Sequence, residues 1–300
     1  MASITEGTLK QYSSCFKKYW VFCLNKREDP LVYNLQIYLD FLVDILNKGN
    51  SFSVINSYRS ALNLLFSPST IDEKIINRFL KGVSNIRPPK PKYSFTWNPD
   101  PVLKYLEALY PLDSLSLEDL TYKLVTLMAL VSASRVQTLS MIKINNINVS
   151  LERIEIQITD RIKTTALGRN QPLLIFPYFR NKPQLCVAST IETYIKITEP
   201  HRKVKEQNLF LTIKKPFHAA SSQTISHWIK KTLNQAGVDT SIFSAHSVRH
   251  ASTSAAFRAG VSIEQIKNTA GWTPFSNTFF NYYNKPLKEP NDKFAKAIIK

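Results

Sequence analysis

A proline-rich segment at residues 86–101, "IRPPKPKYSFTWNPDP", divides this chain into two parts of different character. Its five prolines have no backbone N–H and a fixed φ, so they cannot continue a helix and they hold the chain extended. We place the domain boundary here and expect a linker over residues 87–97. The basic residues of this segment leave two interpretations open, a solvated connector or one that follows a phosphate backbone; they are Arg87, Lys90 and Lys92.

Residues 1–86, before the linker, have the apolar spacing of helices only. The run from Leu35 through Tyr38 and Leu42 to Leu46 is typical, because its members recur every three or four residues. Short polar segments, "KGNS" and "SPST", separate such runs. The pattern predicts a bundle of about four helices.

Residues 98–284 mix two periods. Alternating isoleucines in "RIEIQITD" (153–160) and a second apolar run, "QPLLIFPYF" (171–179), predict a β-hairpin. Helices are expected around it, among them a buried one at 124–133, "LVTLMALVSA", which has about half the length needed to cross a bilayer. Further helices are expected at about 185–197, 222–236, 246–259, 262–270 and 276–284. The expected fold is mainly α, with a small antiparallel sheet in the larger domain.

The charge of the chain points to a polyanionic partner. Its 39 Lys and Arg exceed its 22 Asp and Glu, which leaves a net charge of +17 over 300 residues. A basic excess of this size favours nucleic acid, because each neutralised phosphate releases condensed counterions.

The cysteines and the first residues indicate an intracellular protein. Cys15, Cys23 and Cys186 are scattered and lack the spacing of a zinc site or a disulfide framework. The start, "MASITEGTLKQ", does not resemble a secretory signal. We therefore expect a soluble protein in a reducing compartment, not in a membrane.

His246 and Arg249 form the most informative pair of candidate site residues. They are three apart in "SAHSVRHASTSAAFRAG", so on a helix they project from one face near its N-terminus, where anions bind. A competing interpretation pairs His246 with His250 as zinc ligands, but this pattern lacks the Glu and an evident third ligand.

Other side chains flank this pair along the chain. Arg135 ends a very apolar helix and needs an anion or carboxylate partner. Lys163 lies where the hairpin connection begins. Gly271-Trp272 supplies an indole donor, and "FNYYNK" carries Tyr282 and Tyr283. Each of these residues has an ordinary structural interpretation when taken alone.

Taken in order, these residues resemble the active site of the tyrosine recombinases, the phage-integrase family. More narrowly, the segments "RPPKPKYSFTW", "SRVQTLS", "IKT", "HSVRHASTSAA", "AGW" and "YYNKP" are similar to recombinases of Crypton-type eukaryotic transposable elements. The resemblance implies a helical core-binding domain (1–86), a linker (87–97), a catalytic domain (98–284) and a C-terminal tail helix (285–300) that is exchanged between subunits or packs in cis. It also implies a C-shaped clamp on double-stranded DNA, a dimer or tetramer on that DNA, and a nuclear location.

The resemblance implies a metal-independent reaction without a cofactor. Tyr283 attacks a DNA phosphodiester, forms a 3′-phosphotyrosyl bond and releases a 5′-hydroxyl. Arg135 and Arg249 meet the negative charge of the phosphorane. Lys163 is the expected general acid, and His246 assists proton transfer or holds a phosphate oxygen.

The remaining assignments concern neighbouring residues. Trp272 is expected to donate a hydrogen bond where many relatives use His, and Thr138 stands where relatives commonly carry an acidic residue that orients the first Arg. Alignment of "TFFNYYNK" on the family's usual ending selects Tyr283 over Tyr282, the runner-up. Neighbours on a helix point about 100° apart, so only one of the two tyrosines can face the phosphate. Ser57, Arg59 and His250 are expected as DNA contacts. For Arg59, a purely solvated position on the helix surface is an open alternative. His250 is also expected to support its neighbours.

Two other functions are compatible with these residues. A type IB topoisomerase shares the phosphotyrosine chemistry but relaxes supercoils. A transposon-derived protein that has lost its activity would bind DNA without cutting it. The filled set of catalytic positions favours a recombinase over the inactive protein.

Overall fold

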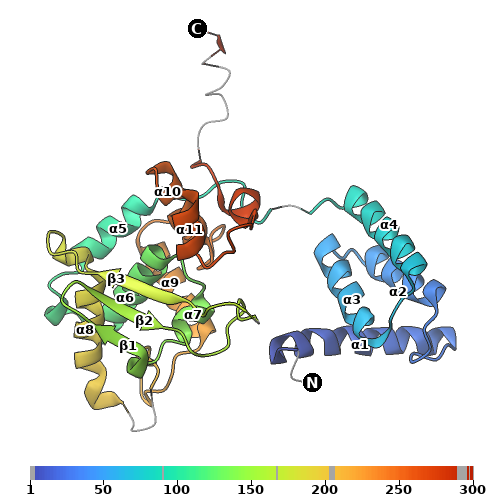
Figure 1. Ribbon diagram of the computed structural model, residues 1–300, viewed down its shortest axis with the longest axis horizontal. Coiled ribbons are helices and arrows are strands. Elements are labelled where there is room, and N and C mark those ends of the chain that lie inside the picture. Colours follow the sequence, from blue (N-terminus) through green and yellow to red (C-terminus); the bar gives the residue numbers. More distant parts are fainter. Residues whose placement is uncertain are drawn as a thin grey trace. The chain divides into compact units, whose positions relative to one another are not determined.

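The computed structural model describes residues 4–89, 91–166, 168–202, 207–288, 296, 298 and 299. The chain divides into two compact units, residues 1–92 and 93–300. Figure 1 shows that the first is built of helices and the second of helices with a sheet. Lys90 and most of the expected tail helix lie outside the described residues.

The first unit is a bundle of four helices, as the spacing of its apolar residues predicts. Each helix begins after a residue whose side chain accepts a backbone N–H of the first turn. The amphipathic faces enclose a core that includes Tyr19, Tyr38 and Phe41. The helices are α1 (Glu6–Lys26), α2 (Leu35–Asn47), α3 (Phe52–Leu65) and α4 (Thr70–Ile86).

The second unit is mainly helical. Its longer helices lie close to the ranges that the apolar spacing predicts, which confirms the mainly α fold class. Among the described residues its α-helices are α5 (Pro99–Ala108), α6 (Leu117–Ser132), α7 (Val136–Ser140), α8 (Val187–Thr198), α9 (Ser222–Gln235), α10 (Ser247–Arg258) and α11 (Ile263–Thr269). Shorter turns of helix are η1 (Leu112–Ser114), η2 (Ile144–Asn146), η3 (Pro183–Leu185), η4 (Glu199–His201) and the π-helix η5 (Phe279–Tyr283).

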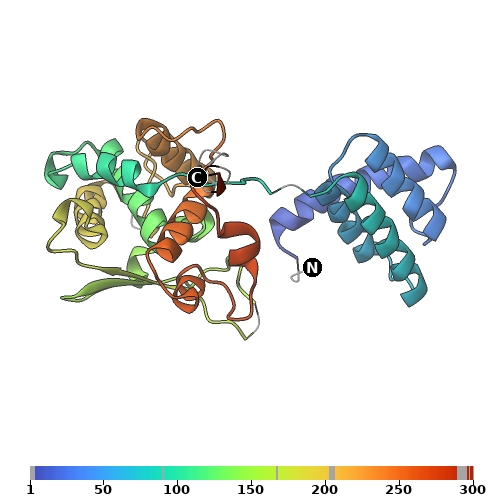
Figure 2. The ribbon, with the colours of Figure 1, turned by 90° about the horizontal axis from the view of Figure 1, so that it is seen from above.

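A three-stranded antiparallel sheet, in the order β1-β2-β3, forms one outer layer of this unit, and helices lie behind it (Figure 2). The strands are β1 (Ile147–Val149), β2 (Arg153–Gln157) and β3 (Leu173–Pro177). Ile154 pairs with Phe176 and Ile156 with Leu174, and all four side chains are buried. The predicted hairpin is therefore present, and β1 is an additional short strand.

Helix α6 is the centre of the second unit. Most of its residues are buried, including Leu124, Leu127 and Met128, as expected for the apolar run at 124–133. Residues 93–97, which the sequence places in the linker, pack with this unit, since Tyr93 and Trp97 belong to its hydrophobic core.

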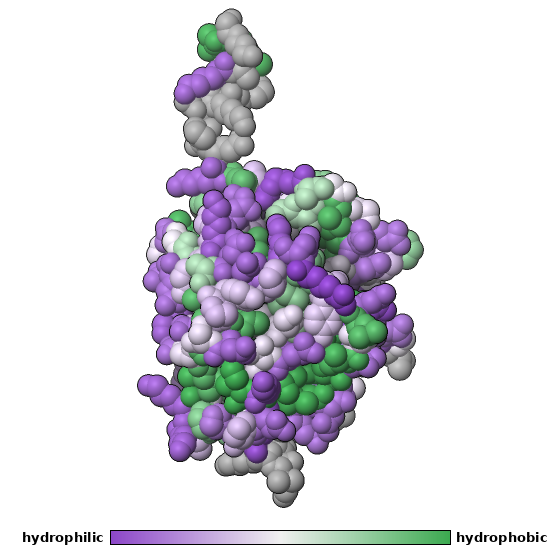
Figure 3. Space-filling view, turned by 90° about the vertical axis from the view of Figure 1, so that its left-hand side faces the viewer, coloured by the Kyte–Doolittle hydropathy of each residue, from purple (hydrophilic) through white to green (hydrophobic). Residues whose placement is uncertain are grey.

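No helix within the described part of the chain is both long and apolar enough to cross a membrane. The face drawn in Figure 3 is mostly hydrophilic, with an apolar area in its lower half.

Candidate active site

Arg249 lies at the centre of the candidate site. It projects from the first turn of α10 and is 2 % exposed. Its Nη1 donates to Ala133 O and its Nη2 to Ala270 O, each over 2.5 Å. Ala133 ends α6 in a left-handed conformation and Ala270 ends α11, so two helix ends direct carbonyls at one guanidinium. The planar group is held in one orientation by these contacts.

Arg135 supplies a second guanidinium beside the first. It is half-buried, precedes α7, and lines the same cavity as Arg249. Burial, and after it the charge of Arg135, lowers the pKa of Arg249 to about 10, so Arg249 still carries its proton at neutral pH. In the described residues neither arginine forms a salt bridge with a carboxylate. Two converging cations without an acidic partner favour binding of an anion.

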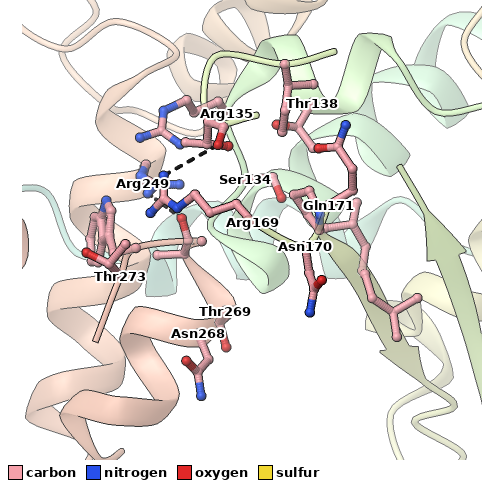
Figure 4. A pocket seen from close by; sticks show the side chains of 18 of the residues that line it. Ser134, Arg135, Thr138, Arg169, Asn170, Gln171, Arg249, Asn268, Thr269 and Thr273 are labelled. Carbon is pink, nitrogen blue, oxygen red and sulfur yellow. Dashed lines mark hydrogen bonds between the residues drawn. The ribbon is translucent and has the colours of Figure 1, made fainter. Parts of the chain in front are cut away.

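The cavity that these arginines line has a volume of about 460 Å³. Figure 4 shows its walls, with Arg135 and Arg249 on one side and Asn170 and Gln171 of the β2–β3 connection on the other. Thr138 also lines it, at the position where an acidic residue was expected by family pattern. Since Thr138 carries no charge, it adds no anion to compete for the arginines.

Tyr283 lies beside His246. The hydroxyl of Tyr283 is 3.0 Å from His246 Nε2, and its ring is 5.4 Å from the Arg249 guanidinium. The side chain of Tyr283 is 8 % exposed, whereas that of Tyr282 is 58 % exposed. The segment is a π-helix and not the expected α-helix, with Asn284 N–H donating to Phe279 O over 2.8 Å. Such π-turns often occur at functional sites.

Trp272 packs against both Arg249 and Tyr283. Its ring lies 4.5 Å from the Arg249 guanidinium and 4.8 Å from the ring of Tyr283. Its Nε1 is buried without a hydrogen-bond partner among the described residues, and an unpaired buried donor requires an explanation. Gly271, with φ of 64°, makes the turn that places the indole here. The indole N–H is thus available to an added acceptor.

His250 stacks on Tyr283 inside the protein. The ring centroids are 4.2 Å apart with an interplanar angle of 19°. Burial, helped by the charge of His246, lowers the pKa of His250 to about 3, so the ring is neutral at neutral pH. The ring of His250 is 8 % exposed, which leaves little of it for contact with DNA. His246 and His250 both contact Tyr283, and no group of three metal-ligating side chains occurs in the described ranges.

Lys163 lies at the edge of the cavity. It is exposed in the β2–β3 connection, where its backbone N–H donates to Gln137 Oε1 over 3.2 Å. Its neighbours Ile162 and Thr164 line the cavity, but the lysine side chain does not. Of the six expected catalytic residues, the structure brings five together and leaves Lys163 at the rim.

The model of the phage integrase family matches residues 103–289. The chain belongs to the phage integrase family. The match covers more than half of the sequence and includes every residue of the site described above.

Three solved structures resemble this phage integrase family member in fold. XerH recombinase in a post-cleavage complex has a TM-score of 0.61 at 17 % identity, over 89 % of this chain and 73 % of that one. A lambda integrase dimer on a COC′ core site gives 0.57 at 16 %, over 97 % and 92 %. The Tn1549 transposon integrase with right-end DNA gives 0.58 at 15 %, over 89 % and 84 %. A search of curated proteins finds no match.

Three residues that lie near the site were not predicted from the sequence: Ser254, Arg169 and Tyr93. Ser254 Oγ donates to Tyr283 O over 2.6 Å and accepts from Lys285 N–H over 3.0 Å. Arg169 lines the cavity from the β2–β3 connection. Tyr93 packs against His250. Only Arg169 had a signal in the sequence, a basic residue in a hairpin connection six positions after Lys163.

The structure describes four of the DNA contacts that the sequence predicts in the first unit and the linker. Ser57 and Arg59 are half-buried on α3, and Arg59 Nε is buried without a partner among the described residues. Arg87 Nη1 donates to Asn50 O over 2.6 Å, and Lys92 is exposed.

Proposed function

We propose that this protein is a site-specific DNA recombinase whose nucleophile is Tyr283. The observation that carries the proposal is the 3.0 Å approach of the Tyr283 hydroxyl to His246 Nε2 beside two arginines that have no acidic partner in the described residues. A phenol, a base and cations around one cavity are the groups needed to attack a phosphodiester.

In the proposed reaction the Tyr283 oxygen bonds to phosphorus as the bond from phosphorus to the 5′ oxygen breaks. His246 takes the phenol proton, and Lys163 gives a proton to the departing 5′ oxygen after its side chain extends from the hairpin into the cavity. The product is a 3′-phosphotyrosyl ester and a free 5′-hydroxyl, and attack by another strand's hydroxyl reverses the step. Because the phosphodiester energy is kept, no nucleotide cofactor is needed.

Positive side chains take the place of a metal in this proposal. Arg249 and Arg135 bind the non-bridging oxygens, and the free N–H of Trp272 donates to one of them. The fixed orientation of Arg249 means that little reorganisation is required as charge develops on phosphorus.

A nicked DNA substrate tests the nucleophile. A nick just past the cleavage site lets the short 5′-hydroxyl fragment diffuse away, so the covalent adduct accumulates and can be counted on a denaturing gel. We expect adduct from the wild type and from Tyr282→Phe, and none from Tyr283→Phe. Adduct from Tyr283→Phe but not from Tyr282→Phe would assign the attack to Tyr282 instead.

The same assay separates the alternative functions. Absence of adduct on every DNA tried, including the ends of its own element, would favour a DNA-binding protein without activity. Adduct together with relaxation of supercoiled plasmid, but without exchange of strands between two duplexes, would favour a type IB topoisomerase.

We also propose the wider setting of this reaction. Crypton-like segments support a transposition role in a nucleus, with residues 1–86 as the core-binding half of a DNA clamp. Lambda integrase is a dimer on its core site and a tetramer on a Holliday junction, which supports self-association on DNA here. In such an assembly the tail at 285–300 is the segment proposed to pass to a neighbouring subunit.

A further inference from the structure

Tyr93 is the first residue of the second unit, and both its hydroxyl and its ring contact residues near the site. It is 4 % exposed. Its hydroxyl is 2.8 Å from Ser244 Oγ and accepts the Ser244 N–H over 3.2 Å. Ser244 precedes His246 by two residues, so the hydroxyl of Tyr93 is held just before the helix that carries the site.

The ring of Tyr93 lies behind the ring of the nucleophile. Its centroid is 5.2 Å from that of His250, edge to face at 80°, and His250 in turn stacks on Tyr283 at 4.2 Å. One neutral imidazole therefore separates Tyr93 from Tyr283. Since buried rings in contact cannot move independently, displacement of Tyr93 changes the support of Tyr283.

The residues after Tyr93 hold the chain on both sides of the site. Trp97 Nε1 donates to Ser247 Oγ over 2.9 Å, and both residues are buried. Thr96 N–H donates to Pro286 O over 2.8 Å, three residues after the nucleophile. The segment 93–97 thus contacts the start of α10 and the chain that leaves Tyr283.

The linker before Tyr93 is short and stiff. Arg87 is tied to Asn50 O of the first unit by its guanidinium. Six residue steps separate Arg87 from Tyr93, a reach of at most about 20 Å when fully extended, and three of the five intervening residues are proline. A connection of this kind transmits displacement better than a flexible one would.

We propose that Tyr93 is a positioning residue for the nucleophile, which acts through His250 on the ring of Tyr283 and joins that ring to the linker. Engagement of the first unit with DNA then changes the tension on the linker and the placement of Tyr283. The inference rests on the proposed function, because it takes Tyr283 as the attacking residue.

The first test replaces the ring. Tyr93→Leu should form adduct on saturating nicked DNA about 10 to 30 times more slowly, because a small misplacement of a nucleophile has a large effect on rate. Its affinity for DNA should change less than about twofold, because the Tyr93 side chain is buried and is not itself an expected DNA contact. Tyr93→Phe, which keeps the ring against His250, should stay within about threefold of the wild type. Tyr178→Leu removes a half-buried tyrosine elsewhere in the same unit and should leave the rate unchanged.

A double variant tests the path through His250. His250→Ala should slow adduct formation, and adding Tyr93→Leu to it should slow the reaction no further, because both changes break one path. General damage to the fold would make the two losses multiply. Multiplying losses, or a wild-type rate for Tyr93→Leu, would overturn the proposal.

Chemical labelling tests the placement of Tyr283 without relying on activity. N-acetylimidazole transfers its acetyl group to a phenol oxygen and releases imidazole, and mass spectrometry locates the ester. In Tyr93→Leu the acetylation of Tyr283 should rise at least about fivefold, since its ring loses support, while the exposed Tyr282 serves as the internal control. Unchanged labelling of Tyr283 would overturn the proposal. Increased labelling in a protein that forms no adduct would reject the recombinase function alone.

Lengthening the linker tests whether the linker affects the placement of Tyr283. Four glycines inserted after Pro89 should slow adduct formation about fivefold while labelling of Tyr283 in the absence of DNA stays at the wild-type level, because only the tension is lost. Substitution of residues 88–91 by four glycines is the matched control, because it lowers the stiffness of the linker without changing its length. A wild-type rate for the insertion would overturn the role of the linker.

Discussion

At the scale of single residues, the site is built on buried polar groups whose partners are fixed or missing for a reason. Arg249 donates hydrogen bonds to Ala133 O and Ala270 O, while its Nε has no partner among the described residues. Trp272 Nε1, in the same cluster, likewise has no hydrogen-bond partner within the described part of the chain. Buried donors left unpaired are unfavourable, so an incoming acceptor such as a phosphate oxygen gains from satisfying them.

His250 should make stability depend on pH. Its pKa falls from the ordinary 6.5 to about 3 in the folded protein, because of burial first and then the charges of His246, Lys285 and Arg249, opposed by a hydrogen bond to the Tyr282 backbone. Between these values the unfolded chain binds a proton that the native state does not, so stability is lost as pH falls below 6.5. The loss from this group should reach about 3 kcal/mol by pH 4.5.

Urea unfolding at several pH values measures this loss. His250→Phe keeps a ring against Tyr283 but removes the titrating group, and the difference in unfolding free energy between it and the wild type isolates the histidine. Parallel pH profiles for the two proteins would contradict the prediction.

At the scale of elements, α10 organises the site by its periodicity. Arg249 and His250 lie three and four residues after His246, and Ser254 lies one turn beyond His250, so they share neighbouring faces of the helix. Ser254 joins α10 to the π-helix η5 through Tyr283 O and Lys285 N–H. The helix thereby fixes both the cation and the segment that carries the tyrosine.

Ser254→Ala should loosen η5. Loss of the hydroxyl leaves Tyr283 O and Lys285 N–H unpaired in a buried place, which should lower the unfolding free energy by about 1–3 kcal/mol and slow adduct formation by about tenfold. Ser252→Ala is the matched control on the same helix, since Ser252 Oγ makes only a 3.5 Å contact to Arg249 O. Chemical denaturation and the nicked substrate measure the two effects, and equal results for the two alanines would be evidence against this role.

At the scale of the whole molecule, the net charge of +17 is the property most relevant to DNA. Affinity should fall steeply with salt, because counterions released from DNA must be taken up again on dissociation. With about eight phosphates neutralised, the slope of log K against log salt should be about −7, a loss of about 10⁴ between 50 and 200 mM.

Fluorescence anisotropy with labelled duplex DNA measures this slope. Lys92→Gln should reduce it by about 1 if the linker follows the phosphate backbone, and should leave it unchanged if the linker is a solvated connector. A wild-type slope shallower than about −2 would contradict the electrostatic prediction.

The sequence by itself determined the mainly helical fold, the hairpin and the break between the two units. Apolar spacing in segments such as 35–47 and 124–133, and alternation in 153–158, report which face of an element is buried. Prolines cannot stand in the interior of a helix, although the first turn of α5 accepts Pro99 and Pro101. The order of Arg135, Lys163, His246, Arg249, Trp272 and the tyrosines was also enough to suggest a family.

Only the tertiary structure decided which side chains meet. It placed Lys163 at the rim and Arg169 in the cavity, turned Tyr283 inward and Tyr282 outward on a π-helix, and put Tyr93 behind His250. These contacts join residues as far apart as 93 and 250, and no local period records them. Packing between distant segments selects them because buried rings and donors must fill space and find partners together.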